Sequence, residues 1–241
     1  MELKGKKIVI IGGSSGMGLA TAQAAARENA QVVIVSHRRD AIATALQSLP
    51  TSAEGFAADA TNESEIKSLF EKIGAFDHLI YTAGDSLNLN PNILSETPIE
   101  ESRKLFEVRY WGIILSIKYA HRWIRPGGSV ILTNGVVGLR PMKAWSIHAS
   151  VAGAIESLTR ALAIELAPLR VNGITAGIVD SPLWGQMDDT QKSNFFENAG
   201  LRLPVGRIGT PEDIAQANVF LMKEEYCTGQ MIILDGGSTL V

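Results

Sequence analysis

The chain has 241 residues, of which 46% are hydrophobic and 20% are charged. This length and balance exclude a disordered chain and predict a single folded domain over residues 1–241 with a large apolar core. The formal net charge is −3 and the sequence has no basic stripe, so a nucleic-acid partner is not expected.

The first apolar run, residues 8–11, ends at Gly12 and Gly13, and this is too short for a signal-peptide core. No run approaches the roughly 20 apolar residues that a membrane helix needs, so no membrane contact is expected. The only cysteine, Cys227, excludes an internal disulfide and a cysteine-based zinc cage, and we expect no metal ion. A chain without disulfides favours a cytoplasmic location.

Short apolar runs alternate with longer segments of helical period, which predicts a doubly wound α/β sheet. Continuous apolar runs are typical of strands that are buried on both faces of a parallel sheet. Strands are expected at residues 7–11, 32–35, 55–58, 79–81, 130–132, 171–174 and 231–234. Helices are expected at residues 16–29, 41–49, 63–73, 99–123, 148–166 and 211–222.

Two stretches interrupt this alternation. Residues 85–98 are polar and rich in Asn and Pro, which predicts a loop. Residues 177–209 are rich in Pro and Gly and carry an acidic run, and we interpret them as a mobile lid with a short helix near residues 190–198. The apolar lid side chains that would meet a substrate are Leu183, Trp184, Met187, Phe195 and Phe196.

Gly12, Gly16 and Gly18 form a G-x-x-x-G-x-G loop between the first strand and the first helix. Glycine permits positive φ angles and lets the backbone approach a pyrophosphate closely, while the helix N-terminus offers free N–H groups to the anion. Ser14 and Ser15 add hydroxyl donors. A glycine-rich turn can be purely structural, but a position after an apolar strand and before a helix favours dinucleotide binding.

The end of the second strand bears on the choice between NAD and NADP. An acid there would bond the ribose 2′-hydroxyl and repel a 2′-phosphate. The chain instead has Ser36, His37, Arg38 and Arg39, with no acid until Asp40. A hydroxyl, an imidazole and two guanidiniums suit a phosphate, so NADP is favoured over NAD. The alternative is that the two arginines simply begin a solvated helix.

With these motifs the chain resembles the short-chain dehydrogenase/reductase family over nearly its whole length. Residues 11–18 are similar to the family's T-G-x-x-x-G-x-G, residues 81–84 stand where it has N-N-A-G, and residues 170–177 resemble R-V-N-x-(V/I)-x-P-G. The resemblance implies a Rossmann-like, seven-stranded parallel sheet in the order 3-2-1-4-5-6-7. It places the cofactor at Gly12, Ser14, Ser15, Gly16, Met17, Gly18, Ser36, Arg38, Asp59, Ala60, Ala83, Gly84, Gly177, Val179 and Ser181.

The active centre departs from the family pattern. The family uses a Ser–Tyr–Lys set and an Asn, with the Tyr and the Lys four residues apart on one helix. The resemblance places His148 at the Tyr position, Ala152 at the Lys position, Gly135 at the Ser position and Arg109 at the Asn position. None of the chain's four tyrosines is followed by a lysine four residues on, so the usual proton donor is absent in any register.

Two functions therefore remain open. In the first, the chain is an NADP(H)-dependent oxidoreductase that reduces a small carbonyl, enone or imine, with His148 as proton donor and Arg109 as a cation or as an anchor for an anionic substrate. A nearby guanidinium would, however, lower the pKa of His148 and leave it a poor acid. In the second, the chain is an inactive NADP(H)-binding sensor or structural partner. Secondary candidates on the same rim are Asn134, Tyr81, Lys143 and Asp180.

The resemblance also bears on assembly. Segments 99–123 and 148–166 pack into a four-helix interface in similar family members, which implies a homotetramer or a homodimer. The alternative is that their apolar side chains only cover the sheet. The apolar and small residues concerned are Trp111, Ile113, Ile114, Ile117, Ala154, Ala161 and Ala163.

Overall fold

The computed structural model describes residues 1–84, 93–185 and 187–241. Over these residues, seven parallel strands form one sheet in the order β3-β2-β1-β4-β5-β6-β7, which confirms the predicted Rossmann-like architecture. The strands are β1 (Lys7–Ile11), β2 (Gln31–Ser36), β3 (Glu54–Ala57), β4 (Phe76–Tyr81), β5 (Ile124–Gly135), β6 (Arg170–Ala176) and β7 (Met231–Leu234).

Strand β5 differs most from its prediction, because it begins at Ile124 instead of residue 130. Its first residues include a Pro-Gly-Gly sequence that is typical of a turn. The register of β5 against β4 is irregular between Phe76 and His78, which accommodates these residues. A Cβ at Gly128 would stand 2.1 Å from the Asp77 carbonyl oxygen, so only glycine lets β5 approach β4 here.

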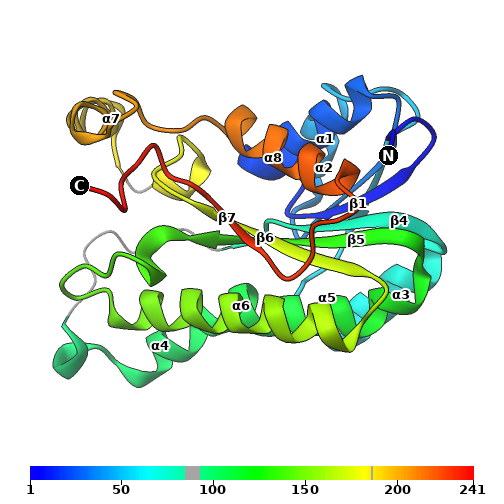
Figure 1. Cartoon of the computed structure of the whole chain (residues 1–241), viewed down its shortest axis with the longest axis horizontal. Coiled ribbons are helices and arrows are strands. Elements are labelled where there is room, and N and C mark those ends of the chain that lie inside the picture. Colours follow the sequence, from blue (N-terminus) through cyan, green and yellow to red (C-terminus); the bar gives the residue numbers. More distant parts are fainter. Residues whose placement is uncertain (85–92, 186) are drawn as a thin grey trace.

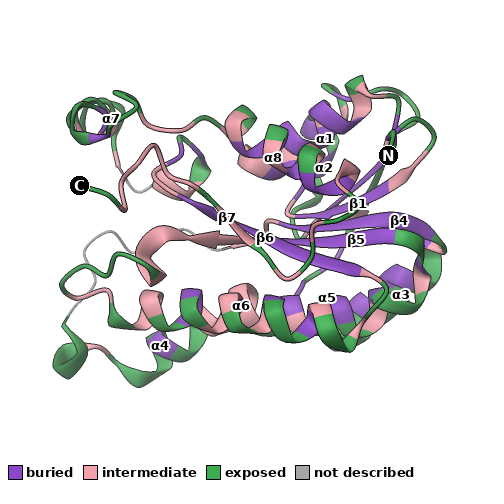
Figure 2. Ribbon diagram, viewed as in Figure 1, coloured by how far each residue is buried: buried purple, intermediate pink, exposed green. Residues whose placement is uncertain are grey.

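The α-helices are α1 (Gly16–Arg27), α2 (Arg39–Leu46), α3 (Glu63–Ile73), α4 (Ile99–Phe106), α5 (Gly112–Ala120), α6 (Ser146–Glu165), α7 (Asp189–Arg202) and α8 (Pro211–Lys223). Helices α1, α2 and α8 cover one face of the sheet, and α3, α5 and α6 cover the other (Figure 1). The strands between these layers are mostly buried (Figure 2), as their continuous apolar runs predict.

The helix predicted over residues 99–123 is not uniform. A π-helical segment, Glu107–Trp111, separates α4 from α5, and a 3-10 turn, His121–Trp123, follows. The cause lies in β4, where the Tyr81 hydroxyl donates a hydrogen bond to the carbonyl oxygen of Val108 at 2.5 Å. A side chain that inserts into the helical ladder widens it locally. Gly112 makes room, because a Cβ there would stand 2.2 Å from the tyrosine oxygen.

The two ends of the predicted lid, residues 177–209, lie side by side, because Val179 and Gly209 form an isolated parallel bridge. Helix α7 within it is longer than the predicted 190–198, and the Asp188 carboxylate caps its start by accepting from the Gln191 N–H at 2.8 Å. The predicted loop 85–98 lies partly outside the described residues. Its described part includes a 3-10 turn, Leu94–Glu96.

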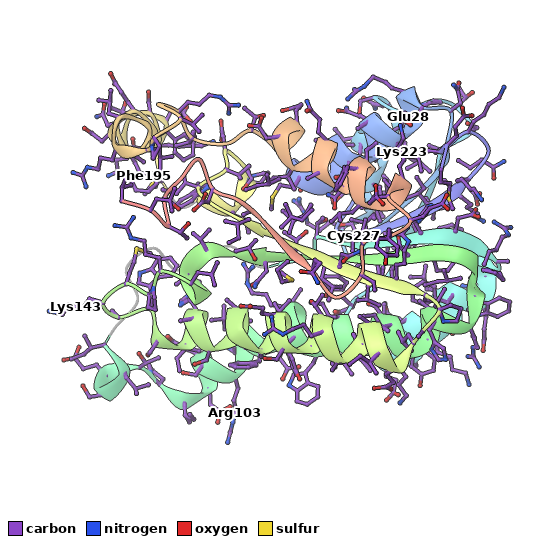
Figure 3. The ribbon with its side chains drawn as sticks, in the orientation of Figure 1. Glu28, Arg103, Lys143, Phe195, Lys223 and Cys227 are labelled. Carbon is purple, nitrogen blue, oxygen red and sulfur yellow. The ribbon has the colours of Figure 1, made fainter. Side chains whose placement is uncertain are left out.

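Helices α1 and α8 are joined by polar contacts as well as by apolar packing. Lys223 at the end of α8 forms an ion pair with Glu28 after α1, and the two side chains lie together in Figure 3. Inside the same layer, the Asn218 amide donates to the Thr21 hydroxyl at 2.9 Å. These contacts hold the middle and the C-terminal end of α1 against α8. None of the helices in the described part of the chain has the length and apolar character needed to cross a membrane.

Candidate active site

The glycine loop joins β1 to α1 across the end of β4. Gly12 has φ +87°, and a Cβ there would stand 2.6 Å from the Ala83 amide nitrogen. A Cβ at Gly18 would stand 2.2 Å from the Gly12 carbonyl oxygen. Both glycines are therefore required for the loop to fold back onto the sheet, which leaves its amides and the start of α1 facing the space above the strands.

This space is a groove of about 530 Å³ across the carboxyl ends of the central strands. We call it the glycine-loop groove. His37, whose imidazole is part of the sequence argument for a 2′-phosphate, lines it, and so does Thr82, which sequence analysis did not assign to the cofactor. Arg39 begins α2 and is not among its lining residues. The predicted cofactor-binding residues that line it are Gly12, Ser14, Ser15, Gly16, Met17, Gly18, Ser36, Arg38, Asp59, Ala60, Ala83, Gly84 and Ser181.

A second cavity of about 190 Å³, which we call the inner cavity, adjoins the groove, and Ala83, Gly84 and Ser181 line both. The two remaining predicted cofactor residues, Gly177 and Val179, line this inner cavity. Much of its wall is apolar. The predicted active-centre positions that line it together are Arg109, Gly135, His148 and Ala152. The apolar walls include Leu105, Met142, Trp145, Val151, Ile155 and Trp184.

His148 stands in the first turn of α6, with its ring centroid 4.5 Å from that of Trp145. Its Nδ1 atom is buried and has no hydrogen-bond partner among the described residues. Burial lowers the pKa of His148 from its usual 6.5, and the positive charge of Arg109 lowers it further. Both causes favour the neutral imidazole, and burial, which sequence analysis did not consider, is the larger.

Arg109 lies on the π-helical segment, at the junction between the groove and the inner cavity. A Cβ added to Gly84 would stand 2.8 Å from the Arg109 Nη1 atom, so the guanidinium lies directly against the Ala83–Gly84 backbone. The π segment, and therefore the contact of Tyr81 with Val108, sets where this guanidinium lies.

Gly135 and Ala152 leave space where the family has longer side chains. A Cβ added to Gly135 would meet no atom of the described chain within 4 Å. Ala152 is buried and faces the same cavity. The Asn134 amide donates to the Ala152 carbonyl oxygen at 3.0 Å, so this side chain contributes to the wall and also holds α6 against β5.

The other rim candidates are placed differently. Tyr81 is buried and directs its hydroxyl at Val108, so its interpretation as a rim residue is wrong. Asp180 pairs with Lys192 at 2.6 Å, and Lys143 is an exposed side chain at the outer edge of the molecule (Figure 3). Neither is among the lining residues of the groove or the inner cavity.

A polar lining residue of the inner cavity, Thr133, was missed by sequence analysis. Thr133 of β5 lines the inner cavity, and its hydroxyl oxygen is buried without a partner among the described residues. The Ser181 hydroxyl oxygen, which lies where the groove meets the inner cavity, is also buried without a partner among the described residues. The available signal for Thr133 was its position, because it is the polar residue that directly follows the apolar run 130–132 near the carboxyl end of β5. Within the described chain, no group of three or more His, Cys, Asp or Glu residues is arranged to hold a metal ion.

Parallel strands, a glycine-rich first turn and a groove across the carboxyl ends define the class of dinucleotide-binding α/β proteins. Residues 12–239 match a family model described as enoyl-(acyl carrier protein) reductase. The chain is 31% identical to the short-chain dehydrogenase/reductase ATR9 of Stachybotrys chlorohalonatus, over 99% of this chain and 98% of that protein. It therefore belongs to the short-chain dehydrogenase/reductase family of oxidoreductases.

Solved structures agree with this membership. A small-chain dehydrogenase in complex with NADPH is 31% identical, with a TM-score of 0.86 over 99% of this chain and 100% of that one. The MalC reductase/Diels-Alderase of Malbranchea aurantiaca is 27% identical, with a TM-score of 0.91 over 99% of this chain and 98% of that one.

Proposed function

We propose that the chain binds NADP(H) in the glycine-loop groove and reduces a small, largely apolar molecule in the inner cavity. The observation that carries this proposal is that Arg109, Gly135, His148 and Ala152 line one cavity opening onto the groove. The small-chain dehydrogenase that shares this fold was solved in complex with NADPH, which supports the choice of NADP(H) as the cofactor.

The groove fits a dinucleotide. The glycine cradle, which a Cβ at Gly12 or Gly18 would fill, suits a pyrophosphate. Ser36 and Arg38 would hold a 2′-phosphate, and NAD is the less favoured cofactor because Ser36, His37 and Arg38, which line the groove after β2, include no acid. By resemblance, Asp59 would contact the adenine, and the buried Ser181 hydroxyl would bond the nicotinamide carboxamide. The nicotinamide ring, when bound, supplies the hydride.

The chain's own residues would position the substrate. The neutral His148 imidazole can donate a hydrogen bond to a substrate heteroatom, but it is a weak proton donor in that state. Arg109 supplies a positive charge at the same junction. Around them, the aromatic and aliphatic walls favour a substrate with an apolar body, which would exclude water from the reacting atoms. The substrate classes that these features suit are carbonyls, enones and imines.

A second candidate function is a catalytically inactive NADP(H)-binding sensor. It is favoured by the absence of any tyrosine followed four residues on by a lysine. In this case the groove would serve cofactor binding alone, and the inner cavity would have no substrate to turn over.

Titration and turnover distinguish the two functions. We expect NADPH to quench protein fluorescence and to bind more tightly than NADH. A panel of carbonyls, enones and imines should then oxidise NADPH, and His148→Ala should lower that rate at least about tenfold. The matched control is His121→Ala, which removes an exposed helical histidine outside the site. Tight binding with no turnover on the panel would favour the sensor, and no binding of either cofactor would refute both functions.

We also propose that the chain assembles into a homotetramer or a homodimer through the α4–α5 and α6 layer. Trp111 and Ile164 are exposed there, at 50% and 82%. Ile113 and Ile117, by contrast, are buried in the chain's own core, so they cannot contribute to an interface. A molar mass by light scattering equal to that of one chain would overturn this proposal.

A further inference from the structure

Two tryptophans from different parts of the fold line the inner cavity. Trp145 directly precedes α6, and Trp184 ends a 3-10 turn of the lid, Pro182–Trp184. The chain has four tryptophans in all, and the other two, Trp111 and Trp123, are not among the lining residues of the groove or the inner cavity. Half of the chain's indole rings therefore belong to one small apolar site.

Contacts within the lid fix the ring of Trp184. Its indole N–H donates a hydrogen bond to the Val179 carbonyl oxygen at 2.8 Å. Its ring centroid lies 5.1 Å from that of Phe195 and 5.8 Å from that of Phe196, which it meets edge to face. Both phenylalanines belong to α7, where Figure 3 labels Phe195. Helix α7 therefore supports the side of Trp184 that the cavity does not use.

An ion pair fastens α7 to the beginning of the lid. The Lys192 ammonium lies 2.6 Å from the Asp180 carboxylate and 5.2 Å from the centre of the Phe196 ring. The ion pair alone contributes little to stability, because Asp180 is half exposed. Together with the ring contacts, however, it fixes the orientation of Trp184 before any ligand binds, which lowers the entropic cost of binding.

The ring of Trp145 is placed by a strained turn. Ala144, immediately before it, has φ +71°, a left-handed conformation that alanine rarely adopts. The Trp145 N–H closes the turn by donating to the Met142 carbonyl oxygen at 3.1 Å, and its ring centroid lies 4.5 Å from that of His148. Such strain persists where the surrounding structure imposes it, and it is concentrated at ligand sites. The chain therefore accepts an unfavourable backbone conformation at the residue that places this indole.

Fixed indole rings discriminate between ligands of similar hydrophobicity. Any apolar group gains from burial in proportion to its area, whatever side chains surround it. An aromatic ring gains more, because offset-stacked and edge-to-face pairs are favoured by the ring quadrupoles. Methionine sulfur atoms also contact aromatic rings favourably, and Met17 and Met142 line the same cavity. An apolar cavity of about 150 Å³ can bind benzene, so the inner cavity, at about 190 Å³, has room for an aromatic ring.

We propose that the substrate carries an aromatic ring and that Trp145 and Trp184 are the residues that select for it. This inference rests on the proposed function and adds the chemistry of the substrate's body to it. The reacting group must reach the junction with the groove, where Ala83, Gly84 and Ser181 line both spaces. The ring is then left against the indole walls of the inner cavity.

The first test compares two ketones that share one carbon skeleton. Acetophenone has an aromatic ring, and cyclohexyl methyl ketone has a saturated ring that is at least as hydrophobic. Their Kd values are measured by ligand-observed NMR titration of the protein saturated with NADP⁺, so that neither ketone is reduced, and again without cofactor. We expect acetophenone to bind at least about threefold more tightly, the effect of a favourable aromatic contact.

The second test assigns this preference to the two indoles. Trp184→Leu and Trp145→Leu should each bring the ratio of the two Kd values close to one, and Trp184→Phe should keep part of the preference. Because the ratio is measured within one protein, a variant that merely loosens the site weakens the binding of both ketones and leaves the ratio unchanged. The matched control is Trp111→Leu, which removes an exposed indole outside the cavity lining and should keep the wild-type ratio.

Turnover separates this inference from the proposed function. With NADPH, acetophenone should have a lower KM than cyclohexyl methyl ketone, and Trp184→Leu should remove the difference. Equal Kd values for the two ketones, or a ratio that is unchanged in both tryptophan variants, would overturn the inference even if the panel of carbonyls, enones and imines is reduced. A preference for acetophenone without reduction of any compound would support the aromatic site and refute the proposed reductase.

Discussion

The side-chain amide of Asn134, near the end of β5, donates a hydrogen bond to the main-chain carbonyl oxygen of Ala152 in α6 at 3.0 Å. His148 stands one turn earlier on that helix. This contact therefore connects the central sheet to the helix that carries the candidate active-site histidine. The contact also places Asn134 against the main chain of Ala152, which by resemblance stands where the family has a lysine.

Replacing this asparagine tests whether the contact positions the site. Asn134→Ala should lower the free energy of unfolding by about 1 kcal/mol, the usual net value of one hydrogen bond. It should also lower kcat for the substrate found on the panel, because the start of α6 is held less firmly, while NADPH binding is retained. Urea unfolding and steady-state kinetics measure the two effects. The control is Asn198→Ala, which removes a similar amide contact in α7, and an unchanged kcat in Asn134→Ala would contradict the positioning role.

Much of the fold follows from local sequence. The apolar runs that predict the central strands β1, β4, β5 and β6 are buried, whereas β7 at the edge of the sheet is only partly buried. The glycine loop stands where its motif places it, because such local features depend on neighbouring residues alone. The segment 107–111 could not be predicted in this way. Its π-helical form depends on Tyr81, a strand residue distant in sequence whose hydroxyl bonds Val108.

The candidate site was predictable where a motif carries it. The glycine-loop residues and Arg38 line the groove, and their role in holding the cofactor stays a prediction. Tyr81 was misplaced, because successive strand residues face opposite sides of the sheet and the motif alone does not say which side faces the groove. Thr133 was missed, because no motif names it and only the structure shows its hydroxyl buried beside the inner cavity.

Arg38 is expected to determine the preference for NADP over NAD. It is exposed at the end of β2 and lines the groove, whereas its neighbour Arg39 begins α2 outside it. Arg38→Glu removes a charge-assisted contact with a 2′-phosphate and should raise the Kd for NADPH roughly tenfold to a hundredfold. The Kd for NADH, which has no such phosphate, should change little. Isothermal titration measures both, with Arg39→Glu as the control, and an equal effect of the two variants would refute this assignment.

Gly18 is expected to be required for both stability and cofactor binding. A Cβ there would stand 2.2 Å from the Gly12 carbonyl oxygen, a main-chain atom that cannot move without opening the loop. Gly18→Ala should therefore cost about 1–3 kcal/mol of stability and abolish measurable NADPH binding. Gly153→Ala is the matched control, because a Cβ at this helical glycine meets nothing of the described chain within 4 Å. It should stabilise the protein by about 0.5–1 kcal/mol, and thermal unfolding of both variants checks the contrast.

His78 is expected to make the protein less stable in mild acid. This side chain is fully buried in β4, and its Nδ1 atom lies 2.9 Å from the Ser129 hydroxyl. Burial lowers the pKa of His78 from 6.5 to about 4, with a smaller lowering from the charge of Arg170 and an opposing effect of Asp77. The unfolded chain therefore binds a proton below about pH 6.5 that the folded chain does not bind until about pH 4.

Because the unfolded state binds more protons in this window, stability must rise with pH through it. His78 should contribute a slope of about 1.4 kcal/mol per pH unit between these two values, and about 3 kcal/mol in total. Denaturant unfolding of the wild-type protein and of His78→Asn at several pH values measures this contribution as a difference in slope. The substitution should lower stability near pH 7 but flatten the acid limb of the curve. Parallel stability curves for the two proteins from pH 7 to pH 4 would show that the buried imidazole is not the group responsible.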